Sequence, residues 1–209
     1  MFLIGRNRAC IKPKAEPTAV LRSPQTMRLF TAVTLPQDVV TALTRLIDQL
    51  RPSARIRWSP ASNLHITTKF IGEWPEERLG ELRAALDSLP AREPIPIEVR
   101  GLGFFPNPHA PRVFWAAVHA GPELATLAQA TSQALESLGV AAEKRPFSPH
   151  LTLARIKEPL PLATLQRAIA SLPAADFGAF TADRFHLYLS QLNPGGSVYT
   201  KLSDYAFRK

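Results

Sequence analysis

Hydrophobic and polar residues follow two alternating patterns along this chain. Apolar residues at helical spacing predict helices over residues 36–51, 75–89, 122–138 and 162–172. Shorter apolar and β-branched runs between them predict strands over residues 29–35, 65–71, 95–101, 113–119, 150–156, 177–182, 184–189 and 198–202. Short strands alternating with helices indicate an α+β or α/β fold.

The predicted elements occur in two copies. Three landmarks recur in the same order at offsets of 83 to 85 residues: Phe30 and Phe114, His65 and His150, and the Leu-Pro pairs at 89–90 and 172–173. Such repetition indicates an internal duplication, with repeats over about 28–103 and 112–182, a joining loop at 103–111 and C-terminal strands within 184–204. Two copies suit two lobes related by a pseudo-two-fold axis.

Composition narrows the classes of protein to which the chain can belong. Half of the formal net charge of +8 lies in residues 1–26, which we expect to be a basic, non-catalytic extension before a catalytic domain at 27–209. Cys10 is the only cysteine, which excludes an internal disulfide and fits a reducing compartment. No apolar run approaches the ~20 residues that cross a bilayer. We therefore expect a soluble, cytoplasmic protein that does not contact membranes.

Each repeat contains a His-x-Thr motif in a predicted strand: His65 and Thr67 in the first, His150 and Thr152 in the second. Residues two apart on a strand share a face, so each motif can direct an imidazole and a hydroxyl to one side. A single motif of this kind is more often part of a core. Its recurrence at the spacing of the duplication favours a functional site.

Strand parity decides whether the residues just after each motif reach the same face. Strict alternation places Lys69 on the face of His65 and Thr67, where it would add positive charge. Arg155 has the opposite parity to His150, so it reaches the site only if the strand bends or ends near Ala154.

Paired histidines suit phosphodiester chemistry. Imidazole titrates near neutral pH, so one ring can remove a proton from a nucleophile while the other donates a proton to a leaving group. Threonine hydroxyls can hold the phosphate oxygens. Both motifs lack the dense histidines and carboxylates of a metallophosphoesterase, so we expect no metal and no cofactor.

From about residue 27 onward, the sequence resembles the two-histidine (2H) phosphoesterases, and specifically the RNA 2′,3′-cyclic phosphodiesterases, also called 2′-5′ RNA ligases. The resemblance rests on both motifs and their flanks at residues 28–30, 63–65, 69–72, 112–116, 149–155 and 196–202. It implies an α+β fold of two antiparallel-sheet lobes with flanking helices and a central cleft. It also implies metal-free hydrolysis of a terminal 2′,3′-cyclic phosphate to a 2′-phosphate.

The resemblance also implies roles for individual residues. His150 would be the general base and His65 the general acid. Thr67, Thr152 and Arg155 would bind the phosphate. The sequence Ser190-Gln191-Leu192 departs from the family's usual Glu-Ser-Leu type of sequence. This departure affects the finer contacts with the substrate that the resemblance implies, and not the catalytic pair.

Other residues have less specific interpretations. Phe147 either stacks on a base of the substrate or packs between the lobes. The remaining histidines do not repeat at the motif spacing, and we expect loop, strand-edge or packing roles for them: His109, His119 and His186.

Several functions stay open at this stage. The leading hypothesis is a monomeric enzyme acting on RNA that ends in a 2′,3′-cyclic phosphate, with tRNA-derived RNA among the candidates. The same acid and base would also serve 2′-5′ ligation. Alternatives are a phosphodiesterase for a small cyclic nucleotide or an ADP-ribose cyclic phosphate, and a non-catalytic RNA-binding or nucleotide-sensing module.

Overall fold

Two antiparallel sheets form the body of the protein. A computed structural model describes residues 25–158, 160–194 and 196–207, so the expected extension at 1–26 lies almost wholly outside the described residues. The first sheet has the order β3-β1-β8-β9, with strands Ile66–Pro75, Thr26–Val33, Arg184–Asn193 and Gly196–Ala206. The second has the order β2-β6-β5-β4-β7, with strands Arg57–Trp58, His150–Arg155, Val113–Ala120, Ile95–Phe105 and Asp176–Ala182.

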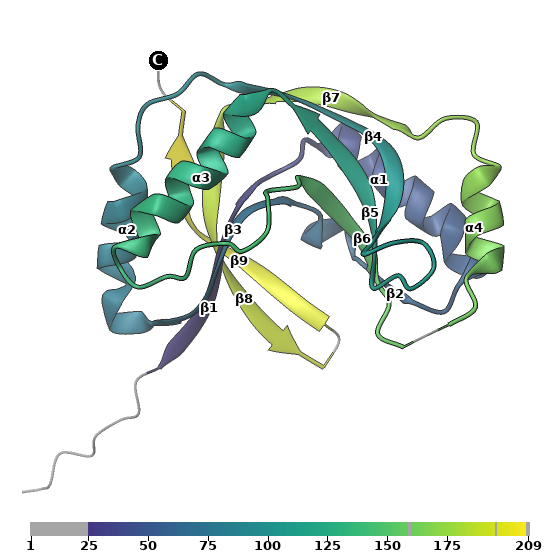
Figure 1. The fold of residues 1–209 in the computed structure, drawn as a ribbon, viewed down its shortest axis with the longest axis horizontal. Helices are drawn as coiled ribbons and strands as arrows, with labels where there is room; N and C mark the ends of the chain where they lie inside the picture. The colour runs from purple at the N-terminus through teal and green to yellow at the C-terminus, as the bar shows by residue number, and fades with distance from the viewer. Residues whose placement is uncertain (1–24, 159, 195, 208–209) are drawn as a thin grey trace, which may run out of the picture.

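In the part of the chain that the structure describes, four α-helices cover the sheets in two pairs (Figure 1). α2 (Leu79–Asp87) and α3 (Pro122–Glu136) pack on each other, and α3 packs on β3 of the first sheet. α1 (Gln37–Leu50) packs on β7 of the second sheet and contacts α4 (Ala163–Ala170). Two antiparallel sheets with helices confirm the predicted α+β class. No helix in the described part of the chain is long and apolar enough to cross a membrane.

The sequence repeats and the lobes do not coincide. α1 belongs to the first repeat but covers the second sheet, whereas α3 belongs to the second repeat and packs on the first sheet. β4, also from the first repeat, lies between β5 and β7. The two halves of the chain are therefore interwoven, and neither repeat makes a lobe on its own.

Helix boundaries depend on the local sequence. α1 buries Val39, Leu43 and Leu50 along one face, as its apolar spacing predicts. The helix predicted over 75–89 begins later, because Pro75 still belongs to β3 and Glu76–Arg78 forms a 3₁₀ turn. Two further 3₁₀ turns, Arg51–Ser53 and Ala61–Asn63, lie between α1 and β3.

Strand boundaries differ from prediction where cross-strand pairing outweighs composition. β4 continues to Phe105, which pairs with Val113, so residues 103–105 are strand and not loop. A Cβ added at Gly103 would lie 2.3 Å from the Trp115 ring, which explains a glycine there. The two-residue strand β2 was not predicted, since it is too short for any periodicity.

A β-bulge interrupts each motif strand at the same point of its repeat. In the pairing of β1 with β3, Ala32 faces Thr67 and Thr31 faces Lys69, so Thr68 is the extra residue. In the pairing of β5 with β6, Trp115 faces Thr152 and Phe114 faces Ala154, so the extra residue is Leu153. A bulge reverses the side-chain alternation beyond it, and this reversal decides which later side chain of each motif strand faces the cleft.

Candidate active site

A cleft of about 580 Å³ lies between the two sheets and brings both motifs together. Thr67 on β3, with His65 just before it, lines one side, while His150 and Thr152 on β6 line the other. Three arginines share the lining with them: Arg28, Arg57 and Arg155. None of the residues found to line the cleft in the described chain is Asp or Glu. Its charge is therefore suited to an anionic ligand.

The backbone orients both histidines in the same way. The Nδ1 atom of His65 lies 2.7 Å from the carbonyl oxygen of Asn63, and that of His150 lies 2.8 Å from the carbonyl oxygen of Ser148. A carbonyl only accepts, so each neutral ring carries its proton on Nδ1 and donates it there. Nε2 of each ring is then available to exchange a proton with a ligand.

Aromatic rings surround His65. The Phe30 ring lies 4.8 Å from its imidazole between centroids, and the Tyr199 ring meets it edge-on at 5.2 Å. The pKa of His65 is lowered to about 4, mainly because the ring is buried; the Asn63 hydrogen bond opposes this shift, while the nearby Arg155 and His150 add to it. His65 is therefore neutral at pH 7 in the ligand-free protein.

The bulge at Leu153 resolves the parity of Arg155. Because Leu153 is the extra residue, the side chain of Arg155 lies on the same side as those of His150 and Thr152 and lines the cleft. The irregularity meets the condition, set by parity, that the strand must bend or end near Ala154 for Arg155 to reach the site. Arg155 is also close enough to influence the pKa of His65 across the cleft.

The equivalent bulge at Thr68 overturns the expected position of Lys69. Strict alternation placed Lys69 beside Thr67, but the extra residue turns it to the opposite side, where its side chain is fully buried. The Thr68 hydroxyl also points away from the cleft and shares a 2.7 Å hydrogen bond with Thr31. Phe70 lines the cleft instead, at the position equivalent to Arg155, and is 55% exposed.

The remaining candidates differ in whether they reach the cleft. Phe147 is partly buried against the core and is absent from the cleft lining, which fits the packing alternative. Ser190 lines the cleft, whereas Gln191 and Leu192 of the same unusual segment line a neighbouring groove.

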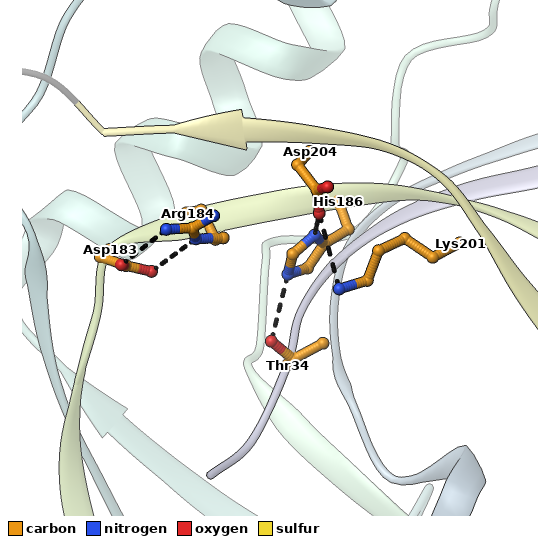
Figure 2. A network of polar contacts seen from close by, with 6 residues as sticks. All are labelled: Thr34, Asp183, Arg184, His186, Lys201 and Asp204. Atoms are coloured by element: carbon orange, nitrogen blue, oxygen red, sulfur yellow. Dashed lines mark hydrogen bonds and ion pairs between the residues drawn. The ribbon is translucent and has the colours of Figure 1, made fainter.

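The other three histidines have the structural surroundings that the sequence predicts. His109 lies in an exposed loop, and Nε2 of His119 lies 3.0 Å from the Arg100 carbonyl oxygen on the neighbouring strand. His186 is buried in the polar network of Figure 2, where Nδ1 contacts Asp204 at 2.5 Å and Nε2 contacts the Thr34 hydroxyl at 3.1 Å. Burial lowers the pKa of His186, which suits a neutral ring on β8 that bridges Asp204 of β9 and Thr34, the residue just after β1.

Sequence reasoning missed several residues that line the cleft. Arg28 and Tyr199 lie in the flanks that carry the family resemblance, although the resemblance assigns them no role. Phe70 stands 85 residues before Arg155, so the duplication itself could have pointed to it. Arg57 had no signal in the sequence; its guanidinium, from the second sheet, lies 3.0 Å from the position that a Cβ on Gly196 of the first sheet would occupy.

Comparison with known proteins identifies the family of this chain. The family model described as LigT-like phosphoesterase matches residues 33–115 and again 117–199, one copy per repeat. The RNA 2′,3′-cyclic phosphodiesterase of Thermus thermophilus is 36% identical over 189 residues, covering 87% of this chain and 91% of the relative. The protein of the same name from Methanocaldococcus jannaschii is 32% identical over 179 residues, covering 86% of this chain and all of the relative.

Solved structures share the fold. A crystal structure of a Thermus thermophilus protein superimposes with a TM-score of 0.74 at 35% identity, covering 87% of this chain and 98% of that chain. Escherichia coli LigT, crystallised with 3′-AMP, superimposes with a TM-score of 0.73 at 24% identity, covering 88% of this chain and all of that chain. With both repeats matched by one family model and the fold shared, this chain belongs to the LigT-like phosphoesterase family of the 2H phosphoesterase superfamily.

Proposed function

We propose that this protein hydrolyses the 2′,3′-cyclic phosphate at the end of an RNA to a 2′-phosphate and a 3′-hydroxyl. The observation that carries the proposal is the pair of motif histidines in one cationic cleft, each oriented by a carbonyl two residues upstream. Relatives named RNA 2′,3′-cyclic phosphodiesterase, at 28–36% identity, support the reaction and the RNA substrate.

The proposed roles of the histidines rest on their neutral tautomer and the family resemblance. Nε2 of His150 removes a proton from water, and the water oxygen forms a bond to phosphorus. The bond from phosphorus to O3′ breaks, and Nε2 of His65 gives O3′ a proton. A base and an acid on facing sides of the cleft suit attacking and leaving oxygens on opposite sides of phosphorus.

The remaining polar residues are proposed to hold the phosphate. Thr67 and Thr152 would donate hydrogen bonds to the non-bridging oxygens, and Arg155 would neutralise the charge that grows on them. Arg28 and Arg57 extend the positive charge along the lining, where neighbouring phosphates of an RNA would lie.

The low pKa of His65 adds a condition to this mechanism. At pH 7 a group with a pKa of about 4 is protonated in only about one molecule in a thousand. A general acid must carry its proton before the reaction, so substrate binding has to raise this pKa. The anionic phosphate supplies the reason, because a negative charge beside the imidazole favours its protonated form.

Turnover in EDTA tests the proposal. The substrate is an oligoribonucleotide ending in a 2′,3′-cyclic phosphate, assayed from about pH 5 to 9 across the histidine range. We expect a 2′-phosphate product from the wild type, and loss of turnover in His65→Ala and in His150→Ala with circular dichroism unchanged. His109→Ala, in an exposed loop, is the matched control. Substrate binding without turnover by the wild type would instead indicate a sensing module.

The same acid and base would also serve 2′-5′ ligation. In that direction the 5′-hydroxyl of a second RNA replaces water, attacks phosphorus and displaces O3′. Adding an oligoribonucleotide with a 5′-hydroxyl to the assay measures this activity. Monomeric state, cytoplasmic location and a tRNA-derived substrate stay predictions of the sequence, which light scattering, cell fractionation and sequencing of bound RNA would test.

A further inference from the structure

Lys69 is buried behind the first motif, in contact with the segment that leads to the second. Its side chain is fully inaccessible to solvent. The ammonium donates one hydrogen bond to the Ala141 carbonyl at 2.7 Å and another to the Ser132 hydroxyl at 3.1 Å. It also lies 3.7 Å from a carboxylate oxygen of Glu143.

These contacts join different parts of the fold. Lys69 belongs to β3 of the first sheet, and Ser132 belongs to α3. Ala141 and Glu143 lie in the connection (residues 137–149), which has no helix or strand and runs from α3 past β3 to β6 of the second sheet (Figure 1). One side chain on the first motif strand therefore holds the segment that ends at the second motif.

Because the Lys69 ammonium is buried, it requires partners in defined positions. A buried ammonium is costly unless hydrogen bonds and an opposite charge compensate it. Two of the three partners of Lys69 are provided by the connection, so displacing the connection would leave the charge buried with Ser132 as its remaining partner. Lys69 thus favours one position of the connection.

The same connection orients His150. Ser148, five residues after Glu143, provides the carbonyl that accepts the Nδ1 proton of His150. The position of this carbonyl fixes the direction of the ring and the atom that carries its proton. A shift of the connection would misdirect His150 while leaving His65 in place, since His65 is oriented by Asn63.

We propose that Lys69 is a positioning residue for the reaction, which fixes His150 relative to His65 by tying the connection to β3. The inference deepens the proposed function and rests on it for the role of His150, but the tie itself can be measured without turnover. Lys69 acts from outside the cleft, through Ala141, Glu143 and Ser148.

The test compares Lys69→Met, which removes the ammonium but keeps an apolar chain of similar length, with Lys144→Met. Lys144 is an exposed lysine of the same connection, so the control removes the same charge from the same segment. We expect Lys69→Met to lower kcat about 10- to 100-fold, as loss of a supporting partner does elsewhere, with KM changed less than about threefold. Lys144→Met should keep wild-type values.

A structural readout separates positioning from general destabilisation. In proton NMR we expect the Nδ1 proton of His150 to exchange with water at least about tenfold faster in Lys69→Met, because its acceptor carbonyl moves. The Nδ1 proton of His65 is the internal control and should keep its rate. Wild-type exchange at His150 in Lys69→Met would overturn the proposal, as would equal acceleration at both histidines.

A second variant covers the case in which Lys69→Met does not fold. Ser132→Ala combined with Glu143→Gln removes two of the three partners and leaves the Ala141 carbonyl. Faster exchange at His150 alone would support the proposal, and unchanged exchange would refute it. If the wild type turns over no cyclic phosphate, the proposed function fails while the exchange experiment still decides whether Lys69 holds His150.

Discussion

The most direct test of the site concerns the protonation of His65. Phe30 and Tyr199 pack against its ring, and burial lowers its pKa from 6.5 to about 4. Replacing Tyr199 with alanine removes the ring that covers one edge of the imidazole and admits water. We therefore expect the pKa of His65 to rise toward 6.5 in Tyr199→Ala, and to stay near 4 in Tyr199→Phe, which keeps the ring.

The size of the effect can be worked out from the shift itself. A difference of about 2.5 pKa units corresponds to about 3 kcal/mol between the charged and neutral imidazole. Because the native state favours the neutral ring, this contribution to the free energy of unfolding is complete above pH 6.5. It is lost as the pH falls toward 4, since the unfolded chain binds the proton first. Tyr199→Ala should lose less stability over this interval.

The assay is an NMR titration of the histidine ring signals, combined with urea unfolding at pH 7 and pH 4. Val198→Ala is the matched control, because Val198 is the exposed neighbour of Tyr199 and is absent from the cleft lining. A His65 that titrates near 6.5 in the wild type would refute the reasoning. So would a Tyr199→Ala variant in which the pKa of His65 stays at about 4.

Three further predictions concern the ligand, the cleft and the core. Adenosine 2′-monophosphate should raise the pKa of His65 above 4, measured by the same NMR titration; an unchanged pKa would argue against protonation through the phosphate. Arg155→Ala should lower kcat/KM about 10²–10³-fold in the turnover assay, with the exposed Arg167→Ala near wild type; equal rates would remove Arg155 from the mechanism. Phe114→Ala should lose about 3–5 kcal/mol of unfolding free energy in urea, because Phe114 is fully buried; Leu192→Ala, at 72% exposed, should lose little, and equal losses would contradict this packing argument.

The sequence predicts features that depend on local spacing. The apolar spacing of α1 predicts its buried face, and the recurrence of His-x-Thr predicts that two motifs act together; the cleft contains both. Elements that depend on partners far along the chain are predicted less well. β4 extends through Gly103 to Phe105 because β5 pairs with it, although the composition of this segment is that of a loop.

The bulges mark the limit of pattern reasoning at the site itself. Strict alternation places the side chain of Lys69 in the cleft and that of Arg155 on the opposite side of its strand. A single extra residue in each strand reverses both placements. Neither Thr68 nor Leu153 could be recognised from the sequence as a bulge residue, because neither residue type is specific to the unpaired position of a bulge. Each bulge is identified only by the register of its strand with the neighbouring strand, β1 for Thr68 and β5 for Leu153.

The duplication explains how two nearly identical motifs can divide one reaction. Equivalent bulges carry equivalent positions into the cleft, yet these hold an aromatic ring at Phe70 and a guanidinium at Arg155. Phe30 and Tyr199 pack against the ring of His65, whereas Phe105 packs edge-on against that of His150. Burial lowers the pKa of His65, and Arg155 also lowers it from across the cleft. The backbone thus offers two matched imidazoles, and the surrounding side chains make them unequal. The proposed division into one acid and one base is therefore set by the residues around the motifs, and substitutions of those residues are the ones expected to exchange the roles of the two histidines.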